Sequence, residues 1–464
     1  MDMKRKIDVR LDNWAKERAT ALLITGARQV GKTYSARRCM EKNFATHLEV
    51  NFSRDPVALD LFSRLSGKDD FYAKLSLMKG KSGLESGNGC VFLDEIQEVY
   101  IRREEMKEDE PSLLRQTIDP ITLLKGLVED GRYRYIVSGS LLGVSLFGVA
   151  LNPVGYMDSI EMFPMDFQEY LMAKGLGDEV TDYLRGCFEK RKTVDDSIHR
   201  RMLSLFREYV LVGGMPEAVE SFISFSDFPK VGEIQKQIIA GYRKDVSKYA
   251  PKEQRLLLME AFDGLPSELN ARSKRYKKTH LSIDNIKNKD ISEEFLWLKE
   301  AGVALPCYHV SDPFYPLRQS EERKVMKLFA SDVGLLSAAL LSPEGRIAIL
   351  NGESPINYGA PYENAVAEEL WAHGSKFLCY WNDKKEGEVD FLTESGSSVI
   401  PLEVKSGKPK RDGSYNHLAL DHLLSINKEI KTAYVLSSSN VRRESEVIWD
   451  MPIYFAQFLD IEAL

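Results

Sequence analysis

The sequence of 464 residues has few cysteines, no long apolar run and no large excess of charge of one sign. Its five cysteines are too widely separated for a disulfide framework or a zinc knuckle, and they suit a reducing cytoplasm: Cys39, Cys90, Cys187, Cys307 and Cys379. The longest apolar stretch, Leu141 to Val154, is interrupted by Ser145 and Asn152 and falls short of the ~20 residues of a membrane helix. The N-terminus has no apolar core after its basic residues, which argues against a signal peptide. We therefore expect a cytoplasmic protein without membrane contacts.

Charge and histidine spacing argue against a general polyanion-binding protein and against a histidine metal site. The chain has 63 basic and 70 acidic residues, a net charge of -7, so it is not a general binder of polyanions. Any contact with nucleic acid must be local. The histidines lack the spacing of metal ligands, and we interpret them as surface or packing residues: His280, His309, His373, His417 and His422.

Residues 1–165 alternate short apolar runs with polar stretches of ~20–40 residues, a pattern typical of a parallel α/β sheet. Each run is short and continuous, as buried parallel strands are. The expected strands are residues 21–25, 47–52, 90–94, 133–138 and 159–163.

The rest of the chain divides into three predicted regions. Residues 166–250 favour a helical subdomain. Residues 251–320 contain two expected helices, 254–262 and 291–300, and then a ribbon near 303–310, an order that resembles a winged helix. Residues 321–464 return to mixed helix and strand patterns and predict a second α/β domain.

The strongest motif is Gly26-Ala27-Arg28-Gln29-Val30-Gly31-Lys32-Thr33, which fits G-x-x-x-x-G-K-[ST] between an expected strand and helix. Glycines let backbone N–H groups converge on phosphate oxygens, and the helix N-terminus adds its dipole. Lys32 is expected to reach the β- and γ-phosphates, and the Thr33 hydroxyl to bind Mg²⁺. The alternative is a turn rich in small residues.

A second motif, Cys90-Val-Phe-Leu-Asp94-Glu95, is an apolar strand that ends in two carboxylates. We expect Asp94 to hold Mg²⁺ and Glu95 to act as general base on the attacking water. An acidic cap of the next helix would explain the same residues. Ser138, at the end of another strand, is a candidate γ-phosphate sensor or a simple turn residue. Arg28, Arg115 and Arg243 are all candidates for an arginine finger, and the sequence selects none of them.

These motifs, in this order, resemble the prokaryotic AAA-type ATPases, specifically the subgroup joined to a C-terminal domain of unknown function. The resemblance extends to further short sequence motifs along the chain: FPMDFQEY at 163–170, GGMPE at 213–217, YRKD at 242–245 and DVGLL at 332–336. It implies a five-stranded ATPase core, a helical lid, a winged-helix region and the terminal domain. One departure is Gly155-Tyr156, where the subgroup leads us to expect Gly-Arg, so any role of that arginine does not carry over.

Three acidic residues and a lysine of the C-terminal region fit a second kind of site. Asp390 lies on one expected strand, Glu403 and Lys405 share a face of the next, and Glu363 lies on an upstream helix. The order resembles the PD-(D/E)xK nuclease core, in which carboxylates bind Mg²⁺ and a lysine activates water. The chain is thus expected to be α/β, with a P-loop NTPase sheet and a restriction-endonuclease-like terminal domain. A strand pair with exposed ionic residues is the alternative.

Residues 271–280, ARSKRYKKTH, carry five basic residues and no acidic one, in a chain that is otherwise acidic. They are the natural place for DNA phosphate contacts, although a solvated loop explains them equally well. The sequence therefore predicts an ATP- and Mg²⁺-dependent ATPase coupled to a nuclease-like domain that contacts DNA. The alternative is a nucleotide-gated switch or scaffold that binds DNA, a protein partner or further copies of itself.

Overall fold

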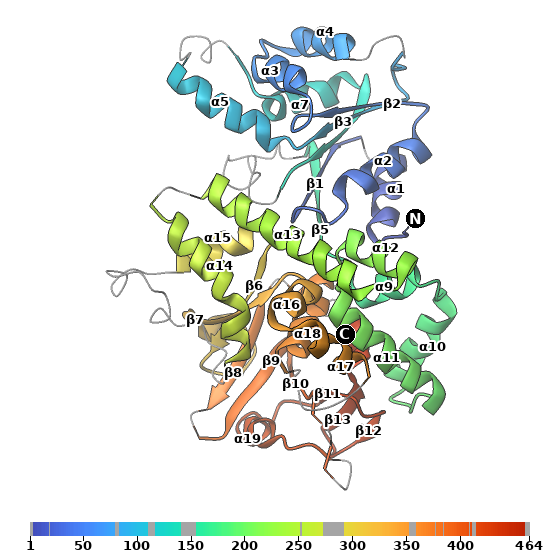
Figure 1. The fold of residues 1–464 in the computed structure, drawn as a ribbon, viewed down its shortest axis with the longest axis vertical. Helices are drawn as coiled ribbons and strands as arrows, with labels where there is room; N and C mark the ends of the chain where they lie inside the picture. The colour runs from blue at the N-terminus through green and yellow to red at the C-terminus, as the bar shows by residue number, and fades with distance from the viewer. Residues whose placement is uncertain are drawn as a thin grey trace. The chain divides into compact units, whose positions relative to one another are not determined.

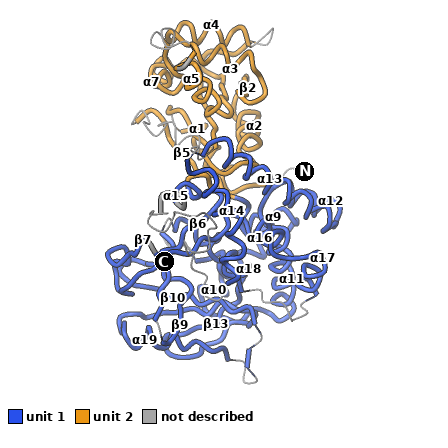
Figure 2. The backbone as a smooth tube through the Cα atoms, turned by 60° about the vertical axis from the view of Figure 1, so that its left-hand side comes forward, with its two compact units in different colours: residues 1–3, 164–299, 303–464 blue, residues 4–163, 300–302 orange. Residues whose placement is uncertain are grey.

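The structure is a computed structural model, and it divides into two compact units, which are described separately (Figure 2). The N-terminal unit comprises residues 4–163 and 300–302, and the C-terminal unit comprises 1–3, 164–299 and 303–464. The residues that it describes are 3–17, 19–78, 83–109, 117–140, 155–250, 253–271, 292–351, 359–375, 377–383, 385–407, 409–410 and 414–459.

The N-terminal unit is built on a five-stranded parallel sheet in the order β2-β3-β4-β1-β5 (Figure 1). This confirms the predicted parallel α/β sheet. Because β4 separates β1 from β3, the loops after β1 and β3 flank the end of β4 at one edge of the sheet. The strands are β1 (Ala21–Gly26), β2 (Thr46–Asn51), β3 (Gly89–Asp94), β4 (Tyr133–Ser138) and β5 (Met157–Met162).

Helices connect these strands and bury an aromatic core against the sheet. Phe62 and Phe71 meet edge to face with ring centroids 5.4 Å apart, within a cluster that includes Tyr135. Two of the helices begin with an Asp-Pro pair, in which Asp55 or Asp119 accepts hydrogen bonds from the first-turn N–H groups. The helices are α1 (Ile7–Glu17), α2 (Lys32–Asn43), α3 (Pro56–Ser63), α4 (Lys68–Met78), α5 (Gln97–Asp109) and α7 (Pro120–Asp130).

The C-terminal unit begins with helices and continues into a mixed domain. Residues 166–250 hold α9 (Phe167–Ala173), α10 (Asp178–Glu189), α11 (Asp196–Val212), α12 (Pro216–Phe225) and α13 (Phe228–Tyr249). Further along the chain come α14 (Arg255–Asn270), α15 (Ser292–Glu300), α16 (Val333–Leu340), α17 (Pro343–Leu350), α18 (Gly359–Ala372) and α19 (Leu418–Ile426). Helix α16 packs against α11 and α13, so the helical region shares one unit with the terminal domain.

An eight-stranded mixed sheet forms the centre of the C-terminal unit, in the order β12-β13-β11-β10-β9-β8-β6-β7. Its strands are β6 (Ala304–Val310), β7 (Glu321–Ala330), β8 (Leu378–Asp383), β9 (Gly387–Ser395), β10 (Ser398–Val404), β11 (Ala433–Ser437), β12 (Arg442–Arg443) and β13 (Ile448–Pro452). The ribbon expected near residue 303 is present as β6 and β7, but β6 also pairs with β8. The predicted boundary at 320 and 321 therefore separates two paired strands, and the ribbon is not set apart as a winged helix.

Two of the motifs that carry the family resemblance meet inside this unit. Asp332 is fully buried and its Oδ2 accepts a hydrogen bond from the Gly214 backbone N–H at 2.6 Å. A Cβ on Gly213, where φ is 75°, would lie 2.7 Å from the same Asp332 oxygen, so a side chain at this position would collide with the carboxylate. Burial raises the pKa of Asp332 to about 6. Gly213 and Gly214 therefore pack directly against Asp332.

The state of the cysteines and the character of the helices can be read from the structure. All five cysteines are buried and none forms a disulfide. None of the described helices has both the length and the apolar character needed to cross a membrane.

Candidate functional site: a phosphate loop and a buried carboxylate cluster

The loop between β1 and α2 requires glycine at two positions. Gly26 has φ 148°, and a Cβ there would collide with the carbonyl group of Met162 on β5. Gly31 has φ 101° and caps the N-terminus of α2. Both conformations are disfavoured for residues with a side chain. The loop therefore brings backbone close to the helix N-terminus, where N–H groups and the helix dipole suit an anion.

Lys32 is buried at the start of α2, and its Nζ donates to the carbonyl oxygens of Gly26 at 3.1 Å and Ala27 at 2.8 Å. The ammonium group thus lies within the loop that the sequence assigns to phosphate. An incoming phosphate would exchange these two neutral acceptors for charged ones, which form stronger hydrogen bonds.

Asp94 lies at the carboxyl end of β3 and is fully buried. Its Oδ2 accepts from the Thr33 hydroxyl at 3.0 Å and from the Asn51 amide at 2.7 Å, and its Oδ1 accepts from the Ser138 hydroxyl. Burial raises the pKa of Asp94, and the Ser138 hydrogen bond works against that rise. The structure therefore brings together Thr33, Asp94 and Ser138, which the sequence had placed on three separate elements.

Glu95 follows Asp94 with φ 60°, a left-handed conformation that is rare outside glycine. Its backbone N–H donates to the Ser138 hydroxyl at 3.4 Å, and its carboxylate accepts from the Gln97 amide. Gln97 is itself buried and accepts from the Ser140 N–H at 3.3 Å. The Glu95 side chain is thus positioned by a residue of α5 beside the phosphate loop.

Sequence reasoning missed Asn51 and Gln97. Asn51 was detectable as a polar residue at the carboxyl end of an expected strand, next to the strand of Asp94. Gln97 was detectable as the second residue after the predicted base. Of the arginine-finger candidates, Arg28 is exposed in the loop and Arg243 pairs with Asp263 at 3.0 Å, while Arg115 lies outside the described residues.

The four residues predicted for the C-terminal site lie on or next to neighbouring elements of the C-terminal unit. Glu363 on α18, Asp390 on β9 and Glu403 on β10 are all buried, and Lys405 follows β10 directly. The Lys405 ammonium pairs with Glu403, and Asp390 Oδ2 accepts from the Val404 N–H at 2.8 Å. Burial raises the pKa of Glu403 to about 7, with the charge of Asp390 adding to the rise and Lys405 opposing it.

Lys327 on β7 is a further member of this cluster that the sequence did not reveal. It is fully buried, and its Nζ lies 2.5 Å from Glu388 Oε1. Burial alone would lower the pKa of Lys327, but the charges of Glu388, Glu363 and Asp390 more than offset that effect and raise it. The signal was available, because a lysine interrupts the apolar run from Val325 to Phe329.

The predicted metal ligands of this cluster are near one another without forming a ready cation site. In the described part of the chain, the group whose three ligand atoms lie within 4.8 Å of one another is Asp166, Glu369 and His373. Glu363, Asp390 and Glu403 do not form such a group. The basic segment after Ala271, residues 272–280, lies outside the described residues, so its predicted DNA contacts stay a prediction.

Comparisons with known proteins match three stretches of the chain to family models. Residues 18–171 match an AAA domain, and residues 203–345 and 358–455 match two different domains of unknown function. A search of curated proteins returned no match.

Among solved structures, the chain is similar to a Walker-type ATPase of Pyrococcus abyssi, at 14% identity over 73% of this chain and 96% of that one, with a TM-score of 0.42. It is also similar to PCH-2 of C. elegans, at 14% identity over 47% and 60% of the two chains and a TM-score of 0.26. A third likeness is to Hsp104 of S. cerevisiae in complex with casein, at 12% identity over 69% and 55%, with a TM-score of 0.29. TM-scores this low do not establish a shared overall fold. The match at 18–171 and the loop geometry agree, and this stretch is similar to a P-loop domain of the AAA type.

Proposed function

We propose that the chain hydrolyses ATP with the help of Mg²⁺, at the carboxyl ends of β1, β3 and β4. The observation that carries this proposal is the contact between Thr33 and Asp94 at 3.0 Å beside the phosphate loop. A hydroxyl and a carboxylate oxygen are the ligands that Mg²⁺ prefers, and both belong to the two motifs expected to share one metal ion. When bound, Mg²⁺ would neutralise charge that develops on the phosphate oxygens.

Each surrounding residue then has one role. Lys32 leaves the carbonyl oxygens of Gly26 and Ala27 and binds the β- and γ-phosphates. Glu95, held by Gln97, orients the attacking water and accepts its proton. Ser138 donates to Asp94 and lies where it can respond to the γ-phosphate.

The test is phosphate release from ATP by the purified full-length chain. We expect release in the presence of Mg²⁺ and its loss in EDTA, because Thr33 and Asp94 then hold no cation. Restoring Mg²⁺ in excess should restore the rate. Release that continues unchanged in EDTA would contradict the assignment of Thr33 and Asp94 as metal ligands.

We propose as a second function that the C-terminal cluster cleaves DNA under control of the ATPase domain. The observation in its favour is the buried set of Glu363, Asp390 and Glu403 beside the Lys405 ammonium. In this proposal the carboxylates take up Mg²⁺ or Mn²⁺ once their side chains turn toward a common point, and Lys405 stabilises charge on the phosphate. Asp390 and Glu403 lie on the paired strands β9 and β10, and Glu363 lies on the upstream helix α18, the arrangement on which the resemblance to PD-(D/E)xK nucleases depends.

Cleavage should be measured on linear, single-stranded and branched DNA with Mg²⁺ or Mn²⁺, with and without ATP. We expect the wild type to cleave and Lys405→Ala to lose about 10²-fold or more in rate, the range typical of a positioned catalytic group. The matched control is Lys428→Ala, which removes an exposed lysine of the same unit and should leave the rate unchanged.

Absence of cleavage by the wild type, in a preparation that hydrolyses ATP, would contradict the nuclease proposal. The alternative would then be a nucleotide-gated switch or scaffold. In that alternative the C-terminal unit binds DNA, a protein or another copy of the chain without chemistry.

A further inference from the structure

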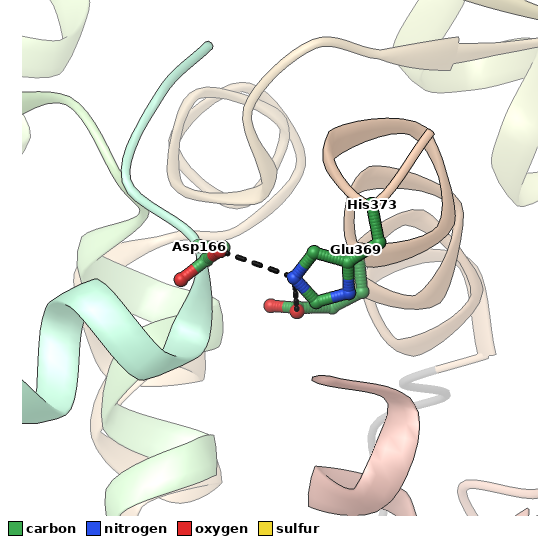
Figure 3. Close-up of side chains that lie close together, drawn as sticks. All are labelled: Asp166, Glu369 and His373. Carbon is green, nitrogen blue, oxygen red and sulfur yellow. Dashed lines mark hydrogen bonds and ion pairs between the residues drawn. The ribbon is translucent and has the colours of Figure 1, made fainter. Parts of the chain in front are cut away.

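A third group of chemistry-bearing residues lies within the C-terminal unit and shares no residue with the two candidate sites. Glu369 lies in the last turn of α18, His373 directly follows the last residue of that helix, and Asp166 is the N-cap residue of α9 (Figure 3). His373 Nε2 lies 3.2 Å from Asp166 Oδ2 and 3.9 Å from Glu369 Oε2. Both carboxylates therefore face the same ring nitrogen, although Asp166 and His373 are 207 positions apart in sequence.

The backbone of α9 fixes the orientation of both carboxylates. Asp166 Oδ1 accepts from the Glu169 N–H at 2.8 Å, and Glu369 Oε1 accepts from the Phe167 N–H at 2.7 Å. Each carboxylate thus gives one oxygen to the first turn of α9 and directs the other toward His373. Hydrogen bonds of this kind hold the ligands of metal sites in place.

The separations suit a tetrahedral cation. With bonds of about 2.0–2.2 Å to nitrogen and oxygen, neighbouring ligands of a zinc ion are about 3.3–3.6 Å apart. The two measured separations, 3.2 and 3.9 Å, bracket that range, and all three ligand atoms lie within 4.8 Å of one another. Asp166 and Glu369 are buried, so solvent reaches the group mainly past His373, whose side chain is 12% exposed.

Other buried polar side chains lie close to these three residues. The buried Tyr209 hydroxyl donates to Met165 O at 3.0 Å and lies 3.4 Å from Glu368 Oε2. Burial raises the pKa of Tyr209, and four carboxylates raise it further: Glu368, Glu369, Asp332 and Asp166. Buried acidic residues beyond the three proposed ligands therefore lie in the same unit, among them Glu368 and Asp332.

We propose that Asp166, Glu369 and His373 bind a zinc ion that fastens the start of α9 to α18. The protein supplies one imidazole and two carboxylates, a set that zinc accepts with water as the fourth ligand. Both carboxylates also accept hydrogen bonds from the backbone of the first turn of α9, so the role of the ion is structural. It is independent of the nuclease proposal, because none of its ligands belongs to the Glu363, Asp390 and Glu403 set.

The test is zinc binding by the full-length chain after removal of metals with a chelator. The variants Asp166→Asn and Glu369→Gln keep the hydrogen bonds to the N–H groups of α9 and remove the charge. We expect the wild type to bind about one zinc ion per chain and each variant to bind it about 10- to 100-fold more weakly or worse. His422→Gln and Glu429→Gln, the latter at an exposed carboxylate of the same unit, are controls for other histidine and carboxylate positions, and both should bind zinc as the wild type does.

A second measurement uses the unaltered protein. Cobalt added in place of zinc should give the visible absorption of tetrahedral Co²⁺, and one equivalent of zinc should abolish it and raise the melting temperature. Absence of zinc binding by the wild type, or equal binding by wild type, Asp166→Asn and Glu369→Gln, would overturn the proposal. The group would then be a hydrogen-bonded ion pair only.

Discussion

Replacing Glu95 by glutamine is expected to leave ATP binding intact and to slow hydrolysis by about 10²- to 10⁴-fold, the usual contribution of a general base. The amide keeps the size of the carboxylate and can still bond to Gln97, so the loop after β3 should hold its shape. What it loses is the ability to accept a proton from water. Single-turnover hydrolysis and equilibrium nucleotide binding, measured on the same preparation, separate the two effects.

The informative comparison is Lys32→Ala, which removes the phosphate-binding ammonium and leaves Glu95 in place. A charged hydrogen bond contributes roughly 1.5–3 kcal/mol, so ATP affinity should fall by about 10- to 100-fold or more. The two variants should thus fail at different steps. Normal turnover in Glu95→Gln would remove the residue from the proposed mechanism.

Gly214→Ala should cause the largest loss of stability among single-methyl substitutions in the C-terminal unit. The added Cβ would lie 2.6 Å from Met165 N and 2.8 Å from Met165 C, both backbone atoms that no rotamer change can move away. Relief requires breaking the Met165 N–H to Gly214 O bond of 2.7 Å or the Gly214 N–H to Asp332 bond of 2.6 Å. We expect about 3 kcal/mol or more of destabilisation, measured by calorimetry or denaturant unfolding.

Gly241→Ala is the matched control, because a Cβ at this position in α13 meets nothing within 4 Å. Alanine is favoured over glycine in a helix interior by about 1 kcal/mol, so this variant should be neutral or slightly more stable. Equal stability of Gly214→Ala and the wild type would show that the contact between these two backbone segments relaxes freely.

The convergence of Thr33, Asp94 and Ser138 was predictable from sequence, for a physical reason. In a parallel sheet the carboxyl ends of the strands meet at one edge, so residues after β1, β3 and β4 must converge there. Thr33, Asp94 and Ser138 each follow or end an apolar run, and the structure brings them into contact. Asn51 and Gln97 were detectable as polar residues near these strand ends, but the sequence does not show which side chain each amide contacts.

The C-terminal unit was less predictable. Lys327 reaches Glu388 across strands that are distant in sequence, and burial of a lysine is the exception rather than the rule. His373 was interpreted as a surface or packing residue, because the histidines do not have the spacing of metal ligands in the sequence. Asp166 reaches it through the fold alone. The pairing of β6 with β8 was not foreseen for a similar reason, since an apolar ribbon does not reveal which sheet it will join.

The pairing of β6 with β8 has a consequence for the modularity of the chain. The two domains of unknown function, matched at 203–345 and 358–455, supply adjacent strands of one sheet. A fragment or fusion that starts between them would leave β8 with an open edge of unpaired N–H and C=O groups, the usual template for aggregation. The two matched domains are therefore expected to be inherited, exchanged and expressed together.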